Sequence, residues 1–188
     1  MSDINFLKKY FDSLKTLIDK EEYLENLIKV KKILLDTNSK GKKTMIFGNG
    51  GSAAISSHFS VDLTKNAGVR CTNYNESDLL TCFSNDYGYE KWVEKAISFY
   101  ADEGDSLILI SAGGNSPNMI NGAKEARKKK INKIITLTGN SNDNNLRKLG
   151  DINFWVDSKA YNHIENVHQI LLLSLVDLII GKTEYPPN

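Results

Sequence analysis

Short apolar runs alternate along the chain with longer segments in which apolar residues recur every three or four positions. Runs at 44–47, 106–110, 133–138 and 152–156 have the length of buried strands, and a weaker one lies at 71–74. Continuous apolar strands separated by helices are typical of a parallel sheet that is covered on both faces. We therefore predict an α/β protein, a three-layer α/β sandwich with a parallel sheet.

Helical periodicity marks both ends of the chain. Residues 1–38 carry an apolar stripe with helical spacing. Its first members are Ile4, Leu7, Phe11, Leu14 and Ile18. A long closing helix is predicted from about Tyr161 to Ile180, ending at Gly181. The first stripe exceeds what one small sheet needs as cover. We expect a single domain in which residues 1–40 form an N-terminal oligomerisation region and residues 41–188 the α/β core.

The composition of the chain argues against several classes of function. The 188 residues include 24 Lys and Arg against 23 Asp and Glu, a net charge of +1. This balance gives no electrostatic reason to expect binding to nucleic acid or to a membrane surface. We find no continuous apolar stretch of about 20 residues, the length of a membrane span. The two cysteines, Cys71 and Cys82, form neither a disulfide framework nor a CxxC site. We expect a cytoplasmic protein.

Two loops combine glycines with hydroxyl side chains directly after apolar strands, at 48–52 and 111–116. Glycine lets the backbone approach a ligand, and the following helix N-terminus offers unpaired N–H groups to an anion. Neither loop matches the nucleotide motifs GxxxxGK[ST] or GxGxxG. We therefore predict a phosphate site. The alternative is that each loop is an ordinary strand-to-helix turn with a serine cap.

The same residues resemble a known family. The segment 48–54, GNGGSAA, followed by His58 and Asp62, resembles the opening of the sugar isomerase (SIS) domain of phosphoheptose isomerases. The segments 85–88, 111–116 and 164–168 follow in the family's order, so the resemblance covers nearly the whole chain. It implies conversion of sedoheptulose 7-phosphate, a ketose, into an aldose phosphate through an enediol. It also implies a homo-oligomer, a tetramer with pockets at subunit interfaces.

The resemblance assigns site residues position by position. The expected substrate-binding residues are Asn49, Gly50, Gly51, Ser52, Asn85, Asp86, Ser111, Ala112, Gly113, Asn115 and Ser116. Asp62 is the expected base, and Glu165 or His168 the expected proton partner. Family members can hold Zn, which here would fall to His58 and Asp62. By spacing alone, Glu165 and His168 three residues later would complete a set of four, although the corresponding family histidine is not a usual ligand and the pair can be a simple intrahelical contact. For two of the site residues an interpretation without ligand contact is also open. Asp86 can form an Asx turn before Gly88, and Glu165 can be a solvated first-turn residue.

Three departures from the family pattern leave a second hypothesis open. Leu173 stands where the family has its catalytic histidine, and leucine can neither transfer a proton nor bind a metal. Ala112 and Gly113 replace a threonine and a serine, which removes two hydroxyl donors. Asp62 is shorter than the family's glutamate. The alternative function is therefore a catalytically silent SIS module that binds a sugar phosphate or a protein partner.

Overall fold

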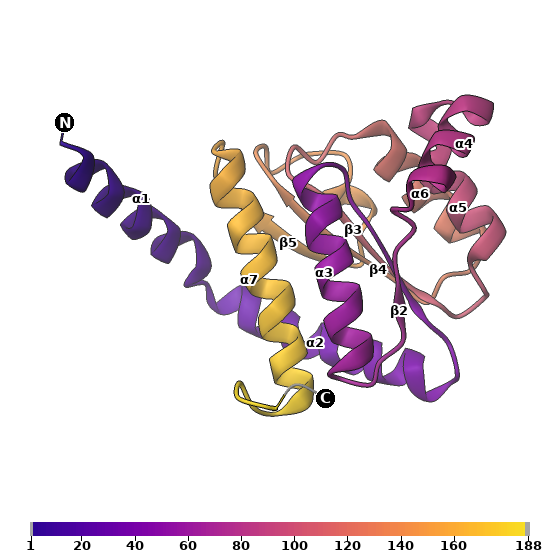
Figure 1. Ribbon diagram of the computed structural model, residues 1–188, viewed down its shortest axis with the longest axis horizontal. Coiled ribbons are helices and arrows are strands. Elements are labelled where there is room, and N and C mark those ends of the chain that lie inside the picture. The colour runs from indigo at the N-terminus through magenta and orange to yellow at the C-terminus, as the bar shows by residue number, and fades with distance from the viewer. Residues whose placement is uncertain (1, 187–188) are drawn as a thin grey trace.

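A five-stranded parallel sheet forms the centre of the molecule (Figure 1), seen in a computed structural model that describes residues 2–186. The strand order is β2-β1-β3-β4-β5, and all neighbouring strands are parallel. The strands are β1 (Thr44–Phe47), β2 (Cys71–Thr72), β3 (Ser106–Ser111), β4 (Lys133–Gly139) and β5 (Ile152–Val156). Each apolar run forms a strand, and the weakest run forms the shortest. The predicted α/β sandwich is confirmed.

Within residues 2–186, seven α-helices and two short 3-10 helices precede, connect or follow the strands. The α-helices are α1 (Asp3–Ile18), α2 (Glu21–Ser39), α3 (Gly51–Lys65), α4 (Ser77–Tyr87), α5 (Trp92–Tyr100), α6 (Pro117–Lys128) and α7 (Tyr161–Ile180). The 3-10 helices are η1 (Tyr89–Lys91) and η2 (Arg147–Leu149). The closing helix has the predicted bounds, and Gly181 ends it in the left-handed conformation.

Alternation along each strand divides the core between the two faces of the sheet. Ile46 and Ile108 belong to a cluster with α2, α3 and α7, whereas Phe47, Leu107 and Leu109 pack with α5 and α6. All five side chains are fully buried. Because both faces are covered, apolar residues occupy most strand positions, and this explains why the strands appear in the sequence as apolar runs.

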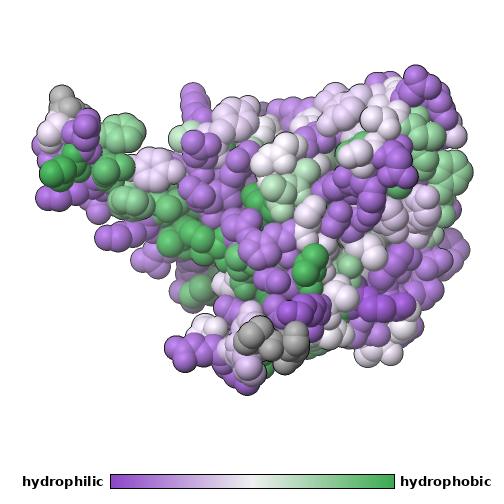
Figure 2. Space-filling view, viewed as in Figure 1, coloured by the Kyte–Doolittle hydropathy of each residue, from purple (hydrophilic) through white to green (hydrophobic). Residues whose placement is uncertain are grey.

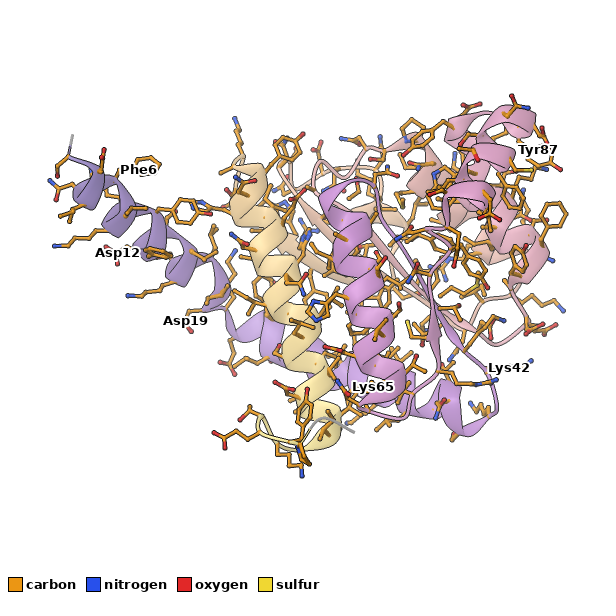
Figure 3. The ribbon with its side chains drawn as sticks, viewed as in Figure 1. Phe6, Asp12, Asp19, Lys42, Lys65 and Tyr87 are labelled. Atoms are coloured by element: carbon orange, nitrogen blue, oxygen red, sulfur yellow. The ribbon has the colours of Figure 1, made fainter. Side chains whose placement is uncertain are left out.

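The N-terminal segment is two helices, where its apolar stripe predicts a single helical run. The chain leaves the helix at Asp19 (φ −85°, ψ 74°), and Lys20 is extended. The break lets α1 project from the body, as Figures 1 and 3 show, with no buried residue of its own. Ile4, Phe6 and Phe11 are each more than half exposed. Figure 2 shows apolar residues gathered along this helix.

Helix α7 is the most apolar helix of the described residues. It is long and apolar enough, by length and composition alone, to cross a membrane. One face of it nevertheless packs on the sheet, where Ile164, Val167, Leu171 and Leu175 form a buried stripe at helical spacing. A core helix that is apolar over most of its circumference gives the same composition as a membrane span.

Candidate functional site

A pocket of about 480 Å³ lies at the carboxyl ends of β1, β3 and β4. Its lining residues are Asn49, Ser52, Ile110, Ser111, Ala112, Gly113, Asn115, Ser116, Asn140, Tyr161 and Glu165. Both glycine–serine loops contribute, together with the residue after β4 and the first turns of α7. Ligands of open α/β sheets bind at this edge, because there the loops lead into helix N-termini.

Two glycines shape the first loop. A β-carbon at position 48 would overlap the backbone of Ser52, so only glycine allows the chain to turn this tightly after β1. Gly50 has φ +54°, a conformation that favours glycine, and α3 starts at the next residue. Ser52 is buried and lines the pocket. The unpaired N–H groups of the first turn of α3 therefore lie beside the pocket.

The second loop is held by its own side chains. The hydroxyls of Ser111 and Ser116 are 3.0 Å apart and hydrogen-bonded. The Asn115 amide donates to the Gly113 carbonyl at 3.2 Å, and its oxygen accepts from the backbone N–H of Asn145 at 3.1 Å. The loop is thus fixed by bonds within it and by one to the segment after β4, and it leads into α6, whose first residue is Pro117.

Asn49 connects the two loops. Its side-chain amide and that of Asn118 on α6 exchange two hydrogen bonds, of 3.1 and 2.8 Å. The Tyr89 hydroxyl also donates to the Asn49 oxygen, at 3.0 Å. Asn118 is almost completely buried. The loop after β1 is therefore tied to the start of α6 and to η1, which fixes the width of the pocket.

Glu165 places a carboxylate at the start of α3. A β-carbon on Gly51 would lie 2.5 Å from its Oε2 atom, so the carboxyl group occupies the space that glycine leaves open. A negative charge is stabilised at a helix N-terminus. None of the pocket-lining residues is Lys or Arg. An anion in this pocket would meet neutral donors, helix N-termini and one carboxylate.

Sequence relatives agree with this geometry. Residues 5–139 match the SIS domain family. A phosphoheptose isomerase of Aliarcobacter butzleri is 35% identical over 167 residues, covering 85% of this chain and 86% of that protein. The chain belongs to the phosphoheptose isomerase family of SIS-domain proteins. Another member, from Fusobacterium nucleatum, is 29% identical over 193 residues and aligns with all of this chain and 98% of its own length.

A solved structure extends the match to the fold. The phosphoheptose isomerase of Francisella tularensis superposes with a TM-score of 0.85 at 25% identity, covering 97% of this chain and 100% of that chain. The SIS domain match ends at residue 139, the last residue of β4. Tyr161 and Glu165 of the pocket therefore come from beyond it, although α7 packs on the same sheet.

His168 is not in the pocket, and its predicted role as a proton partner is wrong. The ring is completely buried, and Nε2 lies 3.2 Å from the Thr138 carbonyl oxygen. Burial lowers its pKa to about 4, so the ring is neutral at neutral pH. Three positions along a helix correspond to a turn of about 300°. The rotation takes His168 off the face of Glu165 and into the buried stripe.

His58 and Asp62 lie further along α3, outside the pocket lining. His58 Nε2 is 3.2 Å from Asp62 Oδ2, and His58 Nδ1 is 3.1 Å from the Gln169 amide nitrogen on α7. Both ring nitrogens are thus engaged. Sequence reasoning missed Gln169, which follows Glu165 by four positions and precedes Leu173 by four. Its helical spacing from Glu165 was the only signal.

The expected zinc ligands do not form a site. Within residues 2–186, no group of three or more His, Cys, Asp or Glu side chains is placed to hold a metal ion. His58 and Asp62 are adjacent, but Glu165 contacts Gly51 and His168 is in the core. Leu173 offers no donor atom. The donors of this chain do not fit zinc, and we derive no chemical step through a metal.

Asn85 and Asp86 lie in the last turn of α4 and do not line the pocket. Their side chains are hydrogen-bonded to each other at 3.0 Å and are exposed. Asp86 belongs to a helix, so the Asx turn considered for it does not form. Tyr89, three residues further on, contacts Asn49. The end of α4 is therefore close to the first loop without reaching the ligand space.

Three pocket residues were missed in the sequence: Ile110, Asn140 and Tyr161. Asn140 has a positive φ of 58° directly after β4, and Asn is one of the few residues that adopt this conformation readily. An asparagine directly after a predicted strand could therefore have been recognised in the sequence. No sequence pattern marks Tyr161, because its place in the pocket depends on how α7 packs against the second loop.

Proposed function

We propose that this protein isomerises a sugar phosphate of the sedoheptulose 7-phosphate type, interconverting ketose and aldose through an enediol. The observation that carries the proposal is the pocket at which two glycine–serine loops and the N-termini of α3 and α6 converge. Membership of the phosphoheptose isomerase family supports the same substrate class.

The phosphate group would anchor the substrate in the pocket. Backbone N–H groups at the start of α3, together with the hydroxyls of Ser52, Ser111 and Ser116, would hold it at the loops. A phosphate held at one end orients the reacting carbons at the other end of the sugar. Ala112, Gly113 and Asn115, which line the pocket, and the neighbouring Gly50 and Gly51 would contribute backbone to the same cradle.

The length of α3 suits a long sugar. Each helical residue rises 1.5 Å, so the backbones of Ser52 and His58 are about 9 Å apart and those of Ser52 and Asp62 about 15 Å. A seven-carbon chain with bonds of about 1.5 Å spans roughly 8 Å when extended. With its phosphate at Ser52, such a sugar would bring its carbonyl end near the His58–Asp62 pair.

In this arrangement the base would be the Asp62 carboxylate, which takes the proton from the carbon next to the carbonyl and later returns one to the neighbouring carbon. His58, bonded to both Asp62 and Gln169, would hold that carboxylate in place, and a water molecule would carry the proton between the two substrate oxygens. Glu165 contacts Gly51, about 16 Å along α3 from Asp62. At that distance Glu165 cannot serve as the proton partner, so we place it at the phosphate end.

The second candidate function is a module that binds the sugar phosphate without converting it. Leu173, at the position of the family's catalytic histidine, favours this function. Proton exchange tests both. The protein is mixed with sedoheptulose 7-phosphate in D₂O and followed by NMR. Product, or deuterium next to the carbonyl, supports the isomerase, whereas substrate line broadening without exchange supports the silent module.

We also propose that the protein assembles as a homotetramer. The exposed apolar residues of α1 support this, since only Leu14, Leu17 and Ile18 near its end pack on the core and the first two turns would be covered only by a partner. His58 is about half exposed, and a neighbouring copy would shield the pair from water. Sedimentation of Phe6→Asp/Phe11→Asp tests the assembly. A tetramer that survives the double substitution contradicts the role of α1.

A further inference from the structure

The second loop is poor in free side-chain donors. Ser111 and Ser116 are hydrogen-bonded to each other, and the Asn115 amide is used within the loop. Ala112 and Gly113, between them, carry no polar side chain. An anion bound here needs further donors, because no Lys or Arg lines the pocket.

Tyr161, from another part of the chain, places a hydroxyl group beside this loop. It is the first residue of α7, and its ring is more than half exposed and lines the pocket. Its hydroxyl oxygen lies 3.6 Å from the point that a β-carbon on Gly113 would occupy. The phenol oxygen is therefore within van der Waals distance of any side chain at position 113.

We propose that Tyr161 is a phosphate-binding residue whose hydroxyl donates a hydrogen bond to the phosphate of the ligand, in place of a side chain at position 113. This inference rests on the proposed sugar-phosphate function and assigns a further residue to that site. A tyrosine hydroxyl is a neutral donor, and its ring has few rotatable bonds, so little freedom is lost on binding.

Gly113 allows a rescue experiment. Its φ is not positive, so other residues can adopt its backbone conformation. An added β-carbon would meet Tyr161 at an ordinary van der Waals distance. A serine at this position therefore fits, and its hydroxyl can extend toward the region that the phenol oxygen leaves when Tyr161 is replaced by phenylalanine.

The experiment uses the full chain and four proteins: wild type, Tyr161→Phe, Tyr161→Phe/Gly113→Ser, and Tyr100→Phe. Tyr100 is the matched control, since it ends α5 on the opposite face of the sheet. Affinities for inorganic phosphate and sedoheptulose 7-phosphate are measured by calorimetry, and the affinity for unphosphorylated sedoheptulose by ligand-observed NMR. Circular dichroism confirms that each variant is folded.

We expect Tyr161→Phe to weaken both phosphate ligands about five- to tenfold, which is the effect of one lost hydrogen bond. Sedoheptulose binding should stay unchanged, the double variant should return to within about twofold of wild type, and Tyr100→Phe should match wild type. Unchanged phosphate affinity in Tyr161→Phe would overturn the inference. So would an equal loss for sedoheptulose, or a double variant as weak as the single one. Wild-type protein that binds phosphate but exchanges no proton would contradict the isomerase alone.

Discussion

The carboxylate of Glu165 lies against the α-carbon of Gly51, at the first residue of α3. A helix N-terminus attracts negative charge, so this side chain is itself an occupant of the anion site. A phosphate that binds there must approach or displace it. The Glu165 carboxylate therefore competes with a bound phosphate for the N-terminus of α3.

Glu165→Gln should tighten the binding of sedoheptulose 7-phosphate by several-fold, because it removes a like charge while keeping the shape of the side chain. Calorimetry at two salt concentrations measures the effect, which should shrink as salt rises. Glu25→Gln on α2, far from the pocket, is the control and should change nothing. Weaker binding by Glu165→Gln would mean that the carboxylate contributes to ligand affinity.

Asp62→Asn should lower turnover at least about a hundredfold, since the general base is lost. The affinity for the sugar phosphate should stay within a few-fold, because Asp62 lies outside the phosphate cradle. Deuterium incorporation followed by NMR measures the turnover. The exposed Asp12→Asn on α1 is the control. Full exchange in Asp62→Asn would remove this carboxylate from the mechanism.

The double variant Ser52→Ala/Ser116→Ala should weaken sugar-phosphate binding by about 1–3 kcal/mol, the loss of one or two hydrogen bonds. Ser98→Ala on α5, on the opposite side of the sheet, serves as the control. Equal affinities in calorimetry for the wild type and the double variant would mean that both hydroxyls have only structural roles.

His168 predicts how stability depends on pH. Burial lowers its pKa to about 4, against an ordinary value near 6.5 in the unfolded chain. The folded state therefore binds this proton more weakly. The contribution of His168 to stability is complete above pH 6.5 and is lost as pH falls toward 4, an effect of about 3 kcal/mol. Urea unfolding at pH 7 and pH 4 should show a smaller loss for His168→Gln than for wild type. Equal losses would contradict a buried neutral ring.

Much of the fold could be predicted because it depends on local pattern. The strand runs and the closing helix at 161–180 were visible as apolar periodicity, since burial on both faces leaves little room for polar residues. The break at Asp19 could not be predicted, because the apolar stripe runs through it without a glycine or proline. Helix α4 was not predicted either, so the position of Asp86 in its last turn was also missed.

The candidate site, like the fold, could be predicted from the sequence only where it depends on local pattern. The two loops were predicted from glycine and serine after strands, which is local chemistry. Tyr161 and Gln169 were not, since their roles depend on which face of α7 meets the second loop and α3. The misplacement of His168 has the same cause. Sequence spacing puts two residues on roughly one side of a helix, but packing against the sheet decides which of them is buried.

The neutral lining of the pocket has a kinetic consequence. Charged clefts draw oppositely charged ligands in by long-range attraction, and their association rates rise steeply at low salt. Here no ammonium or guanidinium group lines the pocket, and Glu165 repels an anion at short range. A sugar phosphate should therefore be captured without steering, at a rate that changes little with ionic strength. Encounter would depend on diffusion and fit, and selectivity would arise after contact.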